Sequence, residues 1–147
     1  LGSAWVLPHP GAPQAVGRMM MRDEEVERIA MEAVMAFERK AGWDPLDVHE
    51  ENRGYDILSR HPETGLERAI EVKGCGGVDA VCLTRHEHET ARKLGRDYWL
   101  YVVYNCHTRP EIHRIQDPAR LPLEPVRVIE RWRVRPETVH RHTEEGV

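Results

Sequence analysis

Asp56, Glu71 and Lys73 are the residues whose types and spacing could carry chemistry. Two carboxylates placed side by side repel each other, so they need a compensating cation or a shared proton. A hard divalent ion such as Mg²⁺ suits them, because it prefers a few carboxylate oxygens together with water. A lysine beside that ion can orient a water molecule or neutralise charge developing on a phosphate. The spacing equally fits a surface hairpin in which Lys73 bridges two acids.

The stretch that carries these residues predicts a β-hairpin. Two apolar-rich runs flank a turn cluster that contains Pro62 and Gly65, which is a hairpin signal. A loop over residues 62–65 would pair Ile57 with Ile70, a register that places Asp56 opposite Glu71. Side chains alternate along a strand, so Lys73 shares the face of Asp56 and Glu71. The other face is expected to be core and carries Tyr55, Ile57, Ile70 and Val72.

The order of motifs around this hairpin resembles a known family. Asp56 followed by Glu71-Val72-Lys73 resembles the Asp…Glu-x-Lys signature of the PD-(D/E)XK nucleases. A longer string of blocks, over about residues 22–118, resembles the C-terminal domain of the plant NO VEIN proteins. One departure is Tyr55, which stands where the superfamily name expects proline. The blocks are Glu38 with Gly42, Asn52-x-Gly54-Tyr55-Asp56-Ile57, Ile70-Glu71-Val72-Lys73-Gly74, Leu83-Thr84-x-x-Glu87 and Tyr98-Trp99-Leu100-Tyr101-Val102-Val103.

The resemblance implies a restriction-endonuclease-like α/β fold, with a mixed β-sheet flanked by helices, and hydrolysis of DNA phosphodiester bonds. It implies that Asp56, Glu71 and the carbonyl of Val72 hold Mg²⁺ or Mn²⁺. Lys73 would then position the attacking water, and Glu38 would tune that water or hold a second ion.

The resemblance also suggests partners. Similar domains end many prokaryotic Swi/Snf-type helicases and occur in anti-phage defence proteins. DNA and a helicase or another defence protein are therefore the expected partners, and self-association is compatible with the sequence. The alternative is a catalytically inactive module that docks on nucleic acid or protein and is attached to a helicase.

The clearest helix is expected over residues 23–41, with Asp23 as its N-cap and Gly42 as its stop. Its apolar residues recur at helical spacing and form one face. Glu38 lies at the margin of that face, from which it would either look toward the hairpin or remain a solvated charge. Glu27 lies on the same flank.

The remaining elements predict a mixed sheet with helices on both faces. Strands are expected near residues 46–48, at 78–83, at 98–104 and at 111–115. A glycine-rich loop is expected at 74–77. Thr84-x-x-Glu87 has the pattern of a capping box, which opens a helix that Gly95 ends.

Both ends of the chain are expected to lie outside the core domain of residues 22–118. Residues 1–21 predict a linker or arm because they are rich in Pro and Gly without a period. Residues 119–147 form an extension in which period-two alternation predicts a strand over 126–135. That strand is expected either to follow a phosphate backbone or to be an edge strand guarded by charge. Its basic stripe is Arg127, Arg131, Arg133 and Arg135.

Length and composition set the outer limits. The chain has 147 residues, a length that fits one domain. Its net charge of −4 argues against a protein that binds nucleic acid nonspecifically through a strongly basic surface. No apolar run is long enough to span a membrane. Three cysteines without framework spacing predict a reducing, cytoplasmic location.

Overall fold

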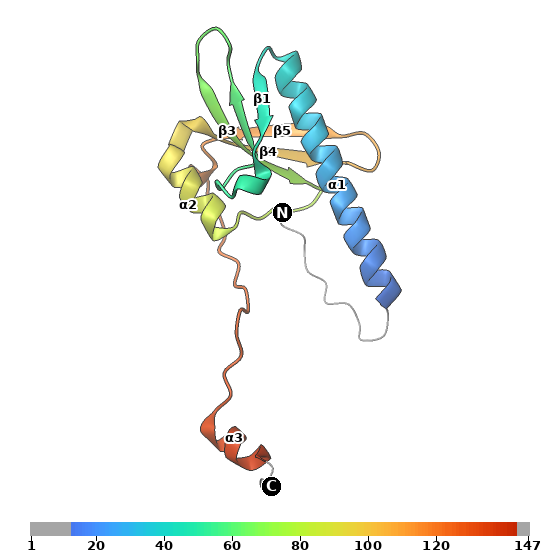
Figure 1. Ribbon diagram of the computed structural model, residues 1–147, viewed down its shortest axis with the longest axis vertical. Helices are drawn as coiled ribbons and strands as arrows, with labels where there is room; N and C mark the ends of the chain where they lie inside the picture. Colours follow the sequence, from blue (N-terminus) through green and yellow to red (C-terminus); the bar gives the residue numbers. More distant parts are fainter. Residues whose placement is uncertain (1–12, 144–147) are drawn as a thin grey trace.

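A five-stranded mixed sheet forms the centre of the protein, as the computed structural model of residues 13–143 describes it (Figure 1). The strands lie side by side in chain order. Their bounds are β1 (Asp44–Asp47), β2 (Ile57–Arg60), β3 (Glu67–Gly74), β4 (Tyr98–Tyr104) and β5 (Glu111–Gln116). The predicted α/β class with a mixed sheet is therefore confirmed.

The β2–β3 hairpin has the predicted register, with Ile57 opposite Ile70. The turn closes through a hydrogen bond from the amide of His61 to the carbonyl of Leu66 at 2.8 Å. Gly65 adopts a φ of +71° in that turn, a conformation that glycine reaches without steric cost. The turn residues thus fix the register, and with it the faces on which the β3 side chains lie.

Strand β3 pairs with β4 in parallel, and helix α2 (Arg85–Leu94) lies in the crossover between them. The predicted capping box is confirmed: the hydroxyl of Thr84 accepts from the amide of Glu87. The predicted strand over residues 78–83 is wrong, because this stretch is a loop whose Val78 is 73% exposed. A short apolar run does not by itself define a strand.

Helix α1 (Pro13–Lys40) begins ten residues earlier than predicted. Asp23 therefore lies inside the helix and is not its N-cap. Proline suits the first position of a helix, and residues 14–22 are mostly compatible with helix. The second half of the predicted arm is thus helical, whereas residues 1–12 lie outside the described residues. Gly42 follows the helix end with a φ of +85°, as its predicted role as a stop requires.

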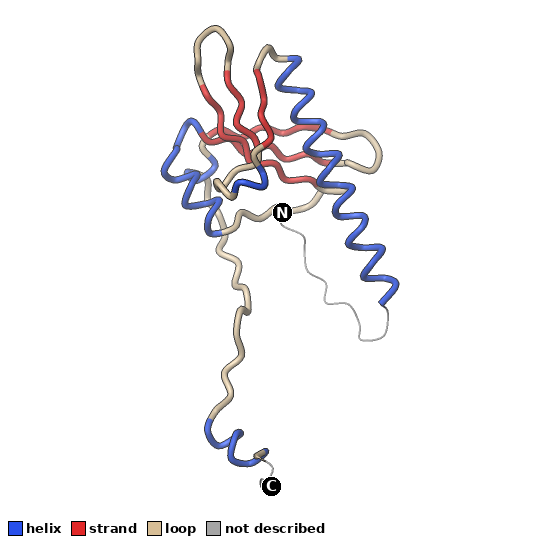
Figure 2. Tube along the Cα trace, in the orientation of Figure 1, coloured by secondary structure: helices blue, strands red, loops and turns tan. Residues whose placement is uncertain are grey.

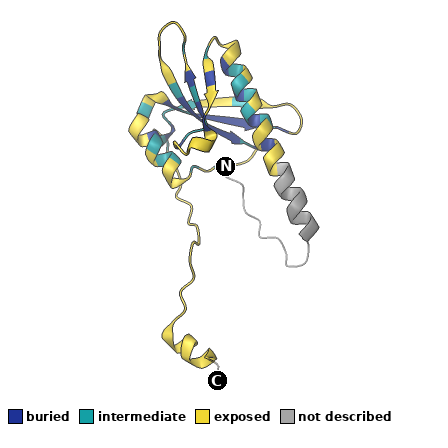
Figure 3. Ribbon diagram, in the orientation of Figure 1, coloured by how far each residue is buried: buried dark blue, intermediate teal, exposed yellow. Residues whose placement is uncertain are grey.

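The two faces of the sheet are covered by different helices, as predicted. Apolar residues of α1 pack on one face, against a cluster that includes Ile57, Ile70 and Tyr101. On the other face Ala91 of α2 packs against Ala69 and Tyr98. Figure 3 shows that burial is concentrated in the sheet and on the inner sides of these helices.

The chain leaves this body as an extended segment that ends in α3 (Pro136–His142) (Figure 2). Residues 122–135 have no regular secondary structure, so the predicted strand over 126–135 is wrong. Its apolar side chains are exposed, and Trp132 is 82% exposed. Period-two alternation needs a neighbouring strand to become a ladder, and no described residue provides one.

Among the described residues, three single-turn 3₁₀ helices lie in the connections, at His49–Glu51, Gly95–Asp97 and Pro118–Arg120. Within residues 13–143, no helix combines the length and the apolar character that crossing a bilayer requires.

Candidate functional site

Lys73 is the centre of a buried charge cluster on the α2 side of the sheet. Its side chain is fully buried, and its ammonium lies 2.8 Å from Oε1 of Glu71 and 2.9 Å from Oε2 of Glu87. Glu71 and Lys73 reach this face together because they are two positions apart on β3. The structure therefore brings these two predicted residues into direct contact and adds a third charged residue, Glu87, from α2.

Asp56 joins this group at the point where the chain enters β2. Its Oδ2 accepts a hydrogen bond from the amide of Val72 at 2.9 Å. That amide lies between Glu71 and Lys73 in the sequence, so the bond ties Asp56 to the strand that carries both. The observed contact of Val72 is through its N–H, while its carbonyl as a metal ligand stays a prediction.

The backbone before Asp56 is held by α2 and β4. Tyr98 donates a hydrogen bond from its hydroxyl to the carbonyl of Gly54 at 2.8 Å. Gly54 has a φ of +84°, and a Cβ atom there would lie only 2.2 Å from Oγ1 of Thr90. A ring nitrogen of His86 also contacts the carbonyl of Asn52 at 3.0 Å. These contacts fix the place of Asp56 relative to Lys73.

With all its carboxyl groups ionised, the cluster would contain more negative than positive charge. Burial, and next the nearby Asp56, raises the pKa of Glu71 to about 8. Burial also raises the pKa of Asp56, and the Val72 amide and Lys73 offset this only in part. Three carboxylates around one ammonium thus favour uptake of a proton or of another cation.

The two partners at the α2 end hold their charges. Burial opposes the charged form of Lys73, but the adjacent carboxylate of Glu71 raises the pKa of Lys73. Burial also opposes the charged form of Glu87, yet the hydrogen bond from Lys73 lowers the pKa of Glu87. Lys73 is therefore an ammonium suited to stabilise negative charge and not a proton acceptor.

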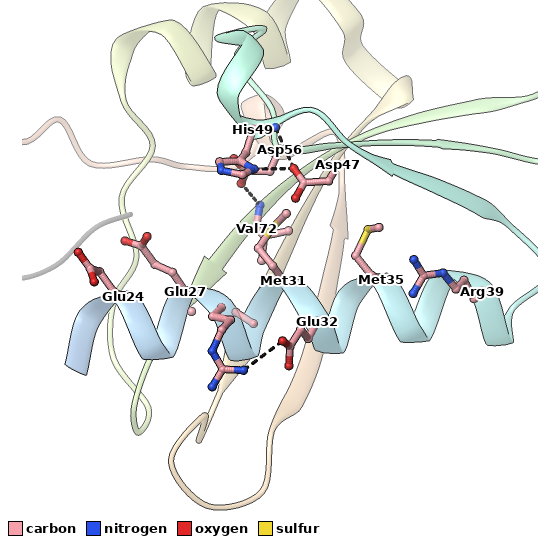
Figure 4. A pocket seen from close by; sticks show the side chains of 13 residues that line it. Glu24, Glu27, Met31, Glu32, Met35, Arg39, Asp47, His49, Asp56 and Val72 are labelled. Atoms are coloured by element: carbon pink, nitrogen blue, oxygen red, sulfur yellow. Dashed lines mark hydrogen bonds and ion pairs between the residues drawn. The ribbon is translucent and has the colours of Figure 1, made fainter. Parts of the chain in front are cut away.

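A cavity of about 620 Å³ opens beside Asp56, between α1 and the sheet (Figure 4). Glu24 and Glu27 of α1 line this cavity together with Asp56. Burial, and to a smaller extent Asp23 and Asp56, raises the pKa of Glu27. Of the two predicted flank acids of α1, Glu27 is thus the one that shares a cavity with Asp56.

Glu38 lies on the opposite face of the sheet from Glu71 and Lys73. It is fully buried and accepts hydrogen bonds from Tyr101 at 2.5 Å, Ser59 at 2.8 Å and Arg68 at 3.2 Å. Tyr101 belongs to the core cluster that packs against α1. The geometry does not bring Glu38 to the hairpin acids, because the sheet separates the two groups. Glu38 does look toward the hairpin, as one alternative predicted, because Ser59 lies on β2 and Arg68 on β3, but it does so on the face opposite Glu71 and Lys73. The other alternative, a solvated charge, is wrong because Glu38 is fully buried.

The predicted arginine stripe lies away from this cluster, on the exposed segment after Arg120. Within residues 13–143, no side-chain hydrogen bond or ion pair joins the arginines of this stripe to the sheet or to the helices that cover it. The stripe consists of Arg127, Arg131, Arg133 and Arg135.

The donor set around Asp56 and Glu71 suits a hard cation, because carboxylate oxygens are the ligands that Mg²⁺ prefers. Across residues 13–143, no three or more His, Cys, Asp or Glu side chains are already arranged to hold a metal ion. Two carboxylates completed by water molecules are nonetheless sufficient for Mg²⁺. The residues therefore fit a sparsely coordinated, water-rich ion better than a closed structural metal site.

Glu87 was not among the predicted site residues, although its capping box was visible in the sequence. The box explains where α2 begins, but nothing local indicates that the same carboxylate also meets Lys73. That contact depends on how the parallel crossover packs on β3.

Comparison with known protein families gives a match over most of the described domain. The family model described as "Protein NO VEIN, C-terminal" matches residues 26–115, a range that includes Asp56, Glu71, Lys73 and Glu87. No curated protein and no solved structure matches the chain.

Proposed function

Because the chain belongs to the NO VEIN C-terminal family, we propose that it is a metal-dependent phosphodiesterase that hydrolyses DNA. The order of helix, three antiparallel strands, crossover helix and parallel strand supports the nuclease-like relationship suggested by the Asp…Glu-x-Lys signature. The role would belong to DNA processing or anti-phage defence, with a helicase or another defence protein as partner.

One observation carries the proposal: Asp56 and Glu71 lie beside a fully buried Lys73, with an excess of negative charge. Burying charges costs free energy unless they are well compensated. One carboxylate is enough to pair this ammonium, so the further acids leave negative charge that a divalent cation would compensate. Raised carboxyl pKa values beside a buried lysine are typical of functional sites.

Asp56 and Glu71 would hold the Mg²⁺ or Mn²⁺ ion, with the carbonyl of Val72 as a further oxygen donor. The chemistry that such an ion supplies is polarisation of a phosphoryl oxygen and a lower pKa for a bound water. Lys73 would stabilise the negative charge that develops on the phosphate, because an ammonium interacts more strongly with the transition state than with the ground state. Asp56 would be held in place by its bond to the Val72 amide.

The test is cleavage of supercoiled and single-stranded DNA in Mg²⁺ or Mn²⁺ by the wild type and by Lys73→Ala. Loss of the ammonium is expected to lower the single-turnover rate on the order of 10²-fold or more. Lys73→Arg should restore the rate only in part, because a planar guanidinium does not occupy the place of a compact ammonium. Thermal melts of each variant separate lost chemistry from lost folding. Absence of cleavage by wild type that demonstrably binds the ion would reject the proposal.

A second candidate is a docking module without catalysis. It is favoured by the ammonium of Lys73, which already makes two ion pairs with Glu71 and Glu87, as a purely structural lysine would. In that case the arginine stripe of the extended segment would supply the contact with nucleic acid. Binding of DNA without cleavage, with an affinity that Lys73→Ala leaves unchanged, would support this candidate.

A further inference from the structure

Glu87 binds two groups through one oxygen atom. Its Oε2 accepts a hydrogen bond from the ammonium of Lys73 at 2.9 Å and another from the amide of Thr84 at 2.8 Å. The hydroxyl of Thr84 in turn accepts from the amide of Glu87 at 3.2 Å. This reciprocal cap fixes the carboxylate at the first turn of α2, so the position of the ammonium depends on where that turn lies.

Helix α2 is itself well anchored to the sheet. Ala91 is fully buried beside Ala69 and Tyr98. The helix also meets the loop before Asp56, through Thr90 against Gly54 and through the His86 ring on the Asn52 carbonyl. Helix α2 therefore holds both the Lys73 side chain and the loop that leads to Asp56.

We propose that Glu87 is a positioning residue, which holds the Lys73 ammonium toward α2 and so leaves Glu71 able to accept a divalent cation. The cation part of this inference rests on the proposed function, whereas the placement of Lys73 does not. Glu87 acts through Lys73 and is not itself assigned a contact with the ion or with DNA.

Two acids share the single ammonium of Lys73. Lys73 lies almost equally far from Glu71 and from Glu87, at 2.8 Å and 2.9 Å. If Glu87 carried no charge, Glu71 would be the stronger partner and would keep the ammonium to itself. The ammonium would then compete with a divalent ion for the same carboxylate. A fixed acid on α2 weakens that competition without removing the lysine from the site.

The placement of Lys73 is tested by the order of its side chain. Relaxation of the ¹³C-labelled ε-carbon of Lys73 in the metal-free protein should show a rigid side chain in the wild type and a more mobile one in Glu87→Gln. Glutamine still offers an oxygen to the Thr84 amide, so the helix cap is retained. Glu89→Gln, on the exposed side of the same helix, is the control and should match the wild type. Equal order in all three proteins would overturn the inference.

Glu87→Asp separates position from charge. Its side chain keeps the carboxylate but is shorter by one methylene group, so it is drawn away from Lys73. It should therefore mobilise Lys73 as glutamine does, although the net charge is unchanged. If Glu87→Asp leaves Lys73 as rigid as in the wild type, the contact between Oε2 of Glu87 and the Lys73 ammonium does not position that ammonium, and the inference fails.

The effect on the ion is tested by calorimetry with Mn²⁺. Glu87→Gln is expected to weaken Mn²⁺ binding about 10- to 100-fold, as loss of a supporting partner typically does. In a Lys73→Met background the same change should cost much less, because the lysine through which Glu87 acts is gone. An equal loss in both backgrounds would mean that only charge matters and would overturn the inference. If the wild type binds no Mn²⁺, the proposed function fails, and the relaxation experiment alone decides whether Glu87 places Lys73.

Discussion

The two faces of the sheet each bury a charged cluster, but with opposite balances of acid and donor. On the α1 face one acid, Glu38, accepts from Tyr101, Ser59 and Arg68. On the α2 face one ammonium, that of Lys73, is surrounded by Glu71 and Glu87, with Asp56 beside them. The first cluster is saturated with donors, whereas the second has negative charge to spare.

This difference separates a structural cluster from a candidate reactive one. The guanidinium of Arg68 lies 3.6 Å from the centre of the Trp43 ring and 5.0 Å from that of Trp99, so the Glu38 cluster is also enclosed by aromatic rings. Such a cluster has no capacity for a further ligand. The α2-side cluster is stabilised by adding a cation or a proton. The balance of charge around each side chain therefore distinguishes Glu38 from Glu71, although both are buried glutamates.

The largest expected effect on stability is on the saturated cluster. Glu38→Ala should lower the free energy of unfolding by about 3–5 kcal/mol, because removal of one partner leaves a buried charge uncompensated. Urea unfolding measures the change. Glu32→Ala, which breaks an exposed pair with Arg28 on the same helix, should cost less than about 1 kcal/mol. Similar losses in both variants would show that the Glu38 cluster is not structural.

A divalent cation should stabilise the folded protein by binding to the α2-side cluster and not to the Glu38 cluster. Mg²⁺ or Mn²⁺ at a hundred times its dissociation constant would add about 2.7 kcal/mol to the stability of the wild type. Asp56→Ala should lose this gain, since one of the two proposed ligands is gone. Thermal melts with and without the ion check both proteins. Equal stabilisation of wild type and Asp56→Ala would place the ion elsewhere.

The pH dependence of the metal-free protein should come partly from Glu71. Its pKa is raised in the folded state, from the ordinary 4.5 to about 8, so the unfolded chain releases this proton first. The contribution of Glu71 to the free energy of unfolding is therefore greatest below pH 4.5 and declines as the pH rises toward about 8. Glu71→Gln should lose less stability between pH 5.5 and pH 8 in urea unfolding with a chelator present. A variant that declines as steeply as the wild type would contradict the raised pKa.

The smallest effect on stability is expected in the extended segment. Arg131→Ala and Arg133→Ala should each change the free energy of unfolding by no more than about 0.5 kcal/mol, because both side chains are exposed. If the stripe contacts a phosphate backbone, each change should reduce the slope of log affinity against log salt by about 1. DNA binding at several salt concentrations measures that slope. An unchanged slope would exclude the segment from a DNA interface.

The sequence predicts best those features that depend only on neighbouring residues, such as turns and helix caps. The turn residues around Gly65 define the hairpin register, and Thr84 with Glu87 defines the start of α2. The segments at 78–83 and 126–135 were mispredicted because an apolar run or an alternation needs a neighbouring strand, which a single sequence does not reveal. Asp23 is a plausible N-cap by type, but compatible residues before it let the helix start earlier.

The candidate site was predictable only in part, for a related reason. Alternation along β3 placed Glu71 and Lys73 together, and the hairpin register added Asp56. The face reached by Glu38 depends on the rotation of α1 on the sheet, which the helical repeat leaves open for a residue at the margin of an apolar face. The contact of Glu87 with Lys73 depends on the packing of α2, a tertiary relation without a local signal.

The parallel pairing of β3 with β4 also bears on how the site is assembled during folding. Antiparallel β2 and β3 meet through a short turn, and such a hairpin forms quickly. Pairing of Ala69 with Tyr98 must first close the long crossover that contains α2, and contacts between distant parts of a chain form slowly. Asp56, Glu71 and Lys73 can therefore come together early, while Glu87 and Tyr98 arrive with the crossover. A partly folded chain would carry the acids of the site without the elements that hold them in place.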